Sequence, residues 1–373
     1  MADTLISCRV SFLFALTASL ASCSEHDASH SSSATGDAGH DPTHNVTPAT
    51  GEPTSTAIPA ITSDALYVVN GADNSISVIN TETNEVAGTI ALANAAFPHH
   101  VYLSADRSKL ALAVPGLDLS GGHSGHTGHG GTSMPGIVMV LDATTGATLK
   151  ARKLPTMNHN AAFASSGEIW TSQMADPGKV LILDPLTLED KGAVDVGAAP
   201  AEVTFSADGK YAFVANGSAD SVTVIDASTR AVAKTITVGD GPVGAWQASN
   251  GIAYVDNEAG KTLSAIDTKT LEVKLTYNLG FTPAYAALAP DGSLWITDTQ
   301  NGKVVVSLAD ADTKQAEILT AAGAHAIAFA GTTTGYITNQ EANTVSVIDV
   351  ATRKVTKTIS VGTKPNGMVW RKK

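Results

Sequence analysis

An internal repeat that runs from Ala65 to the C-terminus constrains the fold more than any other feature of the chain. Each unit holds a short apolar run such as Tyr67-Val-Val-Asn70, and a second run rich in β-branched residues follows it. Short β-branched runs bounded by polar turn residues are typical of strands. The second run occurs seven times, at Ser75–Asn80, Ile137–Asp142, Val180–Asp184, Val222–Asp226, Leu263–Asp267, Val304–Leu308 and Val345–Asp349. The usual spacing is about 42 residues, the length of a four-stranded blade, so the sequence predicts an all-β, seven-bladed β-propeller.

The two ends of the repeat predict how the ring closes. The first unit begins at what would be the second strand of a blade, Leu66–Asn70. The last segment, Asn366–Trp370, matches an innermost strand but has no blade of its own. We expect it to complete the first blade, because closing the ring removes an exposed sheet edge.

Polar residues at the strand ends predict a repeated turn. Six of the second runs end in Asn or Asp, and a Thr follows three residues later, as in Asn80 with Thr83 and Asp226 with Thr229. A short carboxylate or amide in this position accepts backbone N–H groups and closes an Asx turn. We therefore assign structural roles to these acids.

The repeats resemble the YVTN family of bacterial β-propellers over about residues 62–373. The resemblance rests on the strand and turn pattern above, and it implies a propeller fold. Fold alone does not imply an activity, because propellers host enzymes, ligand carriers and scaffolds.

The N-terminus is typical of an exported protein. Arg9 precedes the apolar run Val10–Leu20, which is too short to span a membrane. Leu20-Ala21-Ser22-Cys23 resembles the lipobox of bacterial lipoproteins. The resemblance implies a diacylated Cys23 and, from Ser24, an outer-membrane location in the cell envelope. A plain signal peptide cleaved nearby is the alternative.

We divide the chain into a signal peptide at residues 1–22, a flexible linker at 23–61 and the propeller at 62–373. The linker is rich in Ser, Thr, Gly and Pro and has no apolar period, so it cannot form a core. The formal net charge of −12 disfavours nucleic acid as a partner. We expect a monomer attached to the membrane by its lipid.

Histidines mark the candidate site. Aligning the seven innermost strands on the residues that precede them places His99, His159 and His325 in the same position of three blades. That position surrounds the mouth of the central channel. A Gly-rich insert at 116–136 connects two strands of the second blade on the same face, and it carries His123, His126 and His129.

Three imidazoles at one channel mouth suit a transition metal, and an open fourth position favours zinc. His100 and Glu202 are candidates for a further ligand or for a supporting role. Copper and nickel also fit imidazole ligands. The histidines of the insert would form a weaker capture site, because binding must first order a glycine-rich loop. Each histidine taken alone could instead be a hydrogen-bonded structural residue.

The combination of propeller, ring histidines and Gly/His insert looks like the exported propeller-type zinc metallochaperones. That resemblance implies delivery of zinc to the binding protein of a metal transporter. The lipobox and the His run inside the second blade depart from the pattern. Two alternatives stay open: a scaffold without metal, and a metal-dependent lyase or lactonase with Glu202 as its acid or base. We expect the protein to bind and hand over metal without being an enzyme.

Overall fold

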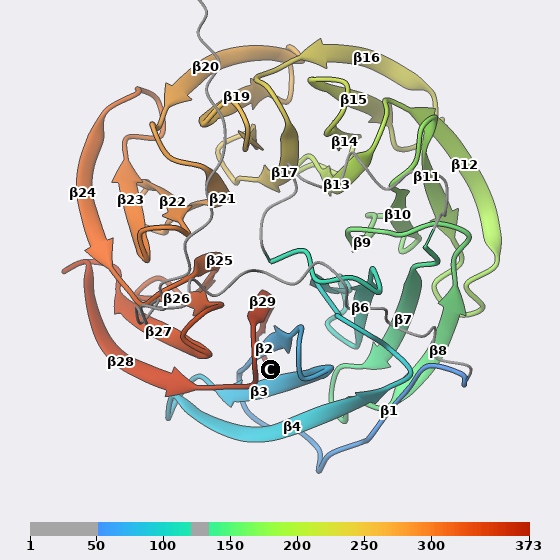
Figure 1. The fold of residues 1–373 in the computed structure, drawn as a ribbon, viewed down its shortest axis with the longest axis vertical. Coiled ribbons are helices and arrows are strands. Elements are labelled where there is room, and N and C mark those ends of the chain that lie inside the picture. Colours follow the sequence, from blue (N-terminus) through green and yellow to red (C-terminus); the bar gives the residue numbers. More distant parts are fainter. Residues whose placement is uncertain (1–50, 121–133) are drawn as a thin grey trace, which may run out of the picture. The chain divides into compact units, whose positions relative to one another are not determined.

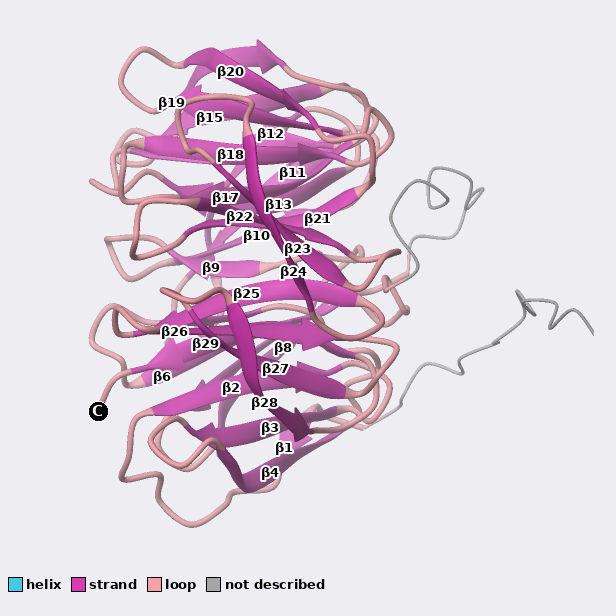
Figure 2. Ribbon diagram, turned by 90° about the vertical axis from the view of Figure 1, so that its left-hand side faces the viewer, coloured by secondary structure: helices cyan, strands magenta, loops and turns pink. Residues whose placement is uncertain are grey.

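Seven antiparallel sheets surround a central axis in the computed structural model, which describes residues 51–120 and 134–373 (Figure 1). The innermost strands line the centre and the outermost strands form the rim. Seen from the side, the strands run between two faces, and loops gather at both (Figure 2). No helix in the described residues is long and apolar enough to cross a membrane. The seven-bladed all-β prediction is confirmed.

Six blades each consist of four consecutive strands. Their bounds, from the innermost strand outward, are β5 (Val101–Leu103), β6 (Lys109–Val114), β7 (Ile137–Asp142) and β8 (Thr148–Lys153) in blade 2; β9 (Ala161–Phe163), β10 (Ile169–Gln173), β11 (Gly178–Leu183) and β12 (Asp190–Val196) in blade 3; β13 (Pro200–Phe205), β14 (Tyr211–Asn216), β15 (Ser221–Asp226) and β16 (Val232–Thr237) in blade 4; β17 (Pro242–Gln247), β18 (Ile252–Asn257), β19 (Thr262–Asp267) and β20 (Glu272–Asn278) in blade 5; β21 (Pro283–Leu288), β22 (Leu294–Asp298), β23 (Lys303–Ser307) and β24 (Lys314–Leu319) in blade 6; and β25 (Ala324–Ala330), β26 (Thr334–Asn339), β27 (Thr344–Asp349) and β28 (Lys354–Ser360) in blade 7.

Blade 1 joins the two ends of the repeat. Its order is β1 (Thr54–Ser55), β4 (Glu85–Ala93), β3 (Ser75–Asn80), β2 (Ala65–Asn70) and β29 (Pro365–Arg371). The pairing of β29 with β2 sets Leu66 opposite Trp370. The C-terminal strand therefore closes the ring as predicted.

The described propeller begins before residue 62, the boundary set from the repeats. Thr54 and Ser55 pair with β4, the Ile58 and Ile61 N–H groups donate to carbonyls of blade 2, and Ile61 is buried. The physical reason is that this short segment covers the outer edge of blade 1 and buries apolar surface, which the polar composition around it conceals.

Burial follows position within each blade. All six residues of β2 are buried, whereas the first five residues of β28 are exposed. The core fills the space between neighbouring sheets, where Tyr67, Trp170 and Trp295 are fully buried. The middle strands therefore hold the ring together, and they position the innermost strands at the channel.

Two sets of polar side chains stabilise the strand ends. Asp226 Oδ1 accepts the N–H groups of Ser228 at 3.1 Å and Thr229 at 2.9 Å, as the turn prediction requires. At the end of β2, Asn70 Nδ2 donates to Ser75 Oγ and Ser77 Oγ at 3.0 and 2.9 Å. Asn216, Asn257 and Asn339 donate in the same way to β15, β19 and β27. The Asn that ends these four apolar runs is therefore a repeated structural clamp.

Candidate metal centre

The histidines of the channel mouth come from the starts of innermost strands. His99 and His100 immediately precede β5, and His159 precedes β9 after one intervening residue. Their exposed fractions are 2%, 3% and 1%. Three imidazoles removed from water so completely need partners, because burying an unpaired polar group is costly.

His99, His100 and His159 form a compact cluster. One ring nitrogen from each lies within 4.8 Å of the others. The Nε2 atoms of His99 and His159 are 3.2 Å apart. The three ring centroids are separated by 4.3, 4.6 and 4.9 Å. We refer to these three residues as the histidine cluster.

Glu202, a fully buried residue of β13, contacts two histidines of the cluster. Its Oε2 atom lies 2.9 Å from His159 Nδ1 and 4.0 Å from His100 Nε2. Its Oε1 atom accepts a hydrogen bond from Asn160 Nδ2 at 2.7 Å and another from the Tyr102 hydroxyl. An imidazole that donates Nδ1–H to the carboxylate keeps its Nε2 lone pair, so this contact directs the basic nitrogen of His159 toward His99.

The surroundings keep the supporting tyrosine protonated. Burial and then the negative charge of Glu202 raise the pKa of the Tyr102 hydroxyl well above its usual value. Burial, Glu202 and Asp256 likewise raise the pKa of Tyr285. Tyr102 therefore remains a hydrogen-bond donor to Glu202 at any ordinary pH.

The spacing of His99 and His159 fits two ligands of a tetrahedral zinc ion. Zn–N bonds of about 2.0–2.1 Å place two imidazole nitrogens roughly 3.3 Å apart in a tetrahedral site. The 3.2 Å between the Nε2 atoms of His99 and His159 agrees with that value. A carboxylate on the far nitrogen of a ligating histidine is the usual support of such a site. Three imidazoles would leave a fourth position for water, a substrate or a second ligand.

The third histidine of the expected trio, His325 of β25, lies farther from the cluster. Its ring centroid is 6.4 Å from that of His99 and 6.3 Å from that of His100. The compact cluster thus holds His99 and His159 of the expected trio together with His100, which the sequence offered as a further ligand or a supporting residue. The regular pairing of β5 begins only at Val101, so the alternation of side chains does not yet separate the two preceding histidines.

Other expected residues lie outside the described part of the chain. These are Cys23 and the histidines of the insert, His123, His126 and His129.

Sequence reasoning missed two features that shape the channel. The Gly367 N–H donates to the His99 carbonyl at 3.0 Å, and a Cβ atom at this glycine would lie 2.7 Å from His100 Nδ1. Trp246 stacks on Tyr285 at 3.8 Å between ring centroids, and its indole donates to Asp256 at 2.6 Å. The His100 ring lies 5.8 Å from that of Trp246. The one signal in the sequence was that Gly367 follows Asn366, in the position that His100 takes after His99 in blade 2.

The profile of the choice-of-anchor I domain matches residues 129–369. No curated protein matches the sequence. Among solved structures, the periplasmic gluconolactonase of Pseudomonas aeruginosa superposes with a TM-score of 0.66 at 16% identity, covering 82% of this chain and 98% of that one. A putative 6-phosphogluconolactonase of Bacteroides fragilis gives 0.65 at 17% identity, with 83% and 98% covered. A functionally unknown protein of Desulfotomaculum acetoxidans gives 0.65 at 12% identity, with 83% and 99% covered. Identities this low show a shared fold alone.

Proposed function

The chain belongs to the choice-of-anchor I domain family, and from that premise we propose that it is a cell-envelope propeller that binds zinc and hands it over. The ion binds to His99, His100 and His159 at the channel mouth. The observation that carries the proposal is the histidine cluster itself, with the Glu202 carboxylate on the far nitrogen of His159.

Charge supports a cation at this position. Glu202 is a buried carboxylate that accepts hydrogen bonds from the amide of Asn160 and the hydroxyl of Tyr102 and contacts the imidazole of His159. A divalent cation bound to the cluster offsets that charge in a poorly solvated place, where electrostatic attraction is strong. Three neutral ligands and an open position also favour a transferable ion over a closed structural site with four protein ligands.

The lipid anchor and the protein that accepts the metal are proposed from the family resemblances of the sequence. The lipobox pattern at Leu20–Cys23 supports attachment to the membrane through a lipid, with the propeller in the envelope. Replacing Cys23 by Ala should then move the protein from the membrane fraction to the soluble fraction, and unchanged partitioning would contradict the anchor. The acceptor proposed is the binding protein of a metal transporter.

Titration calorimetry with zinc, copper and nickel on the full-length protein tests metal binding. We expect one tight zinc site, weakened more than about 100-fold by His99→Ala or His159→Ala, because losing an outer partner alone costs 10–100-fold. His325→Ala is the matched control and should keep the affinity. Wild-type affinity in all cluster variants would overturn the proposal and leave the histidines structural.

An enzyme that uses the same ion to polarise a lactone carbonyl is the alternative, because the proposed ligand set leaves one position open. A transfer assay separates the two. The proposal expects the zinc-loaded protein to lose its ion to an apo acceptor and not to hydrolyse gluconolactone. Turnover of the lactone that requires zinc would favour the enzyme.

A further inference from the structure

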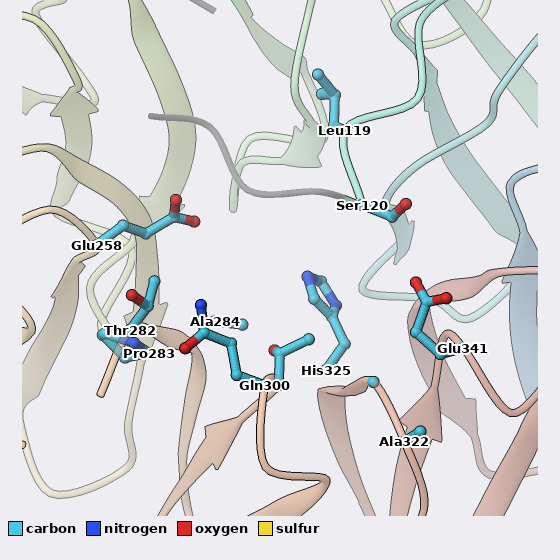
Figure 3. Close-up of a pocket in the computed structure, with 12 residues that line it drawn as sticks. Leu119, Ser120, Glu258, Thr282, Pro283, Ala284, Gln300, Ala322, His325 and Glu341 are labelled. Atoms are coloured by element: carbon cyan, nitrogen blue, oxygen red, sulfur yellow. The ribbon is translucent and has the colours of Figure 1, made fainter. Parts of the chain in front are cut away.

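A cavity of about 300 Å³ is lined by His325, the histidine whose ring lies near those of the cluster (Figure 3). Its wall comes from the loops that follow β18, β22 and β26, from the start of β21, and from Leu119 and Ser120 of the segment after β6. Within the described residues the lining includes two carboxylates and an imidazole, Glu258, Glu341 and His325, and neither Lys nor Arg.

His325 connects the cavity with the cluster. It lines the cavity, and its ring lies 6.4 and 6.3 Å from those of His99 and His100. The cluster itself is almost without solvent exposure, so an ion must pass neighbouring side chains to reach it. An imidazole at this distance can hold an ion that is leaving water before the inner ligands take it.

The two carboxylates make the cavity attractive to cations. Figure 3 shows Glu258 and Glu341 on opposite sides, with His325 between them. Glu258 is buried, whereas Glu341 is exposed to solvent. Like charges that flank a partly enclosed space focus the field there and raise the local concentration of cations. This attraction does not require both carboxylates to coordinate the same ion.

A lysine close to the cavity does not oppose this attraction. Lys364 Nζ lies 2.7 Å from Asp118 Oδ2 and 3.0 Å from Ser120 Oγ. Asp118 offsets the lysine charge, and the two contacts fix the segment that carries Ser120 along the cavity. The charge of this lysine is therefore already paired with a carboxylate.

From this geometry we infer that the cavity is a vestibule for a hydrated divalent cation. Glu258 and Glu341 attract the cation, and His325 passes it to the histidine cluster. The inference rests on the proposed function. It adds an entry path and one residue, His325, that change the rates of zinc capture and release but not the zinc affinity.

Stopped-flow capture of zinc and its release to a chromophoric chelator test the path on the full-length protein. In His325→Asn both rates should fall about tenfold, the effect of about 1.4 kcal/mol on a barrier, and the affinity should stay unchanged. A merely structural loss would weaken affinity as well. Equal rates in the variant and the wild type would overturn the transfer role.

The double variant Glu258→Gln/Glu341→Gln tests attraction without removing an imidazole. Capture should slow by about tenfold at low salt and lose most of its dependence on ionic strength. Glu272→Gln, an outer-strand carboxylate, is the matched control. Capture that keeps its rate and salt dependence in the double variant would overturn the vestibule. The proposed function fails instead if His99→Ala and His159→Ala leave zinc affinity unchanged, so the two failures are distinguishable.

Discussion

Glu202 determines which nitrogen of His159 faces the channel mouth. Its Oε2 atom meets Nδ1 at 2.9 Å, while Nε2 faces the Nε2 atom of His99 at 3.2 Å. Tyr102 and Asn160 hold the carboxylate in turn. The orientation of one proposed ligand thus depends on a chain of contacts that crosses blades 2, 3 and 4.

Replacing that carboxylate should weaken metal binding without removing a proposed ligand. We expect Glu202→Gln to lower zinc affinity 10–100-fold, because the amide cannot strengthen the basicity of His159 as a carboxylate does. Calorimetry measures the change. Glu168→Gln is the matched control, since Glu168 is a buried carboxylate that pairs with Arg230 at 2.8 Å in the described structure. Equal losses in the two variants would assign the effect to stability.

The Asx turns should make the stability of the propeller decrease at acidic pH. Hydrogen bonds from the Thr229 backbone and the Ser228 side chain lower the pKa of Asp226 to about 2. A carboxyl whose pKa is depressed in the folded state stabilises the fold above its unfolded pKa of 3.8 and loses this effect as pH falls through about 2.

The variant Asp226→Asn tests this sign, because Asn80 fills the same turn position with an amide. The difference in unfolding free energy between wild type and variant should be constant above about pH 5. Between pH 4 and 2 the wild type should lose unfolding free energy relative to the variant. Denaturant unfolding at several pH values measures it. A difference independent of pH would contradict the role of the charge.

At the scale of elements, the closing strand carries the greatest weight. β29 pairs with β2 along almost its whole length, and its residues Asn366 and Met368 are buried. Removing it would expose the inner edge of blade 1 and open the contacts between blades 1 and 7.

Deleting residues 366–373 should therefore lower the free energy of unfolding by several kcal/mol, the scale expected when a core strand loses its apolar burial. Thermal unfolding measures the change. Deletion of Lys372 and Lys373 alone, which lie outside β29, is the control and should have little effect. A chain without residues 366–373 that melts at the wild-type temperature would contradict closure by this strand.

The secondary-structure elements also show which parts of the fold and the site could be predicted from the sequence. The repeat predicted the blades, the turns and the closing strand because each depends on local pattern and fixed spacing. His100 could be predicted only as a further ligand or a supporting residue, because it lies just before the regular pairing of β5 starts at Val101 and strand alternation does not fix its direction there. Trp246 and Asp256 meet across β17 and β18. No local signal in the sequence marks that contact as part of the channel wall.

At the scale of the molecule, seven similar blades bring unlike residues to one point. The ring sets the starts of seven innermost strands around the channel, so residues from blades 2, 3, 4 and 7 gather there although they lie far apart in sequence. The gluconolactonase of Pseudomonas aeruginosa shares the fold at 16% identity. Function therefore depends on the side chains at that point and not on the ring.

The metal content of the full-length protein, isolated without chelators, tests the central claim most directly. Mass spectrometry of metals should find about one zinc per chain in the wild type, the stoichiometry of a single tetrahedral site. The double variant His99→Ala/His159→Ala, purified alongside and shown to be folded, should contain none. Wild-type protein without bound transition metal, or a double variant with as much zinc as the wild type, would contradict a metal centre at the channel mouth.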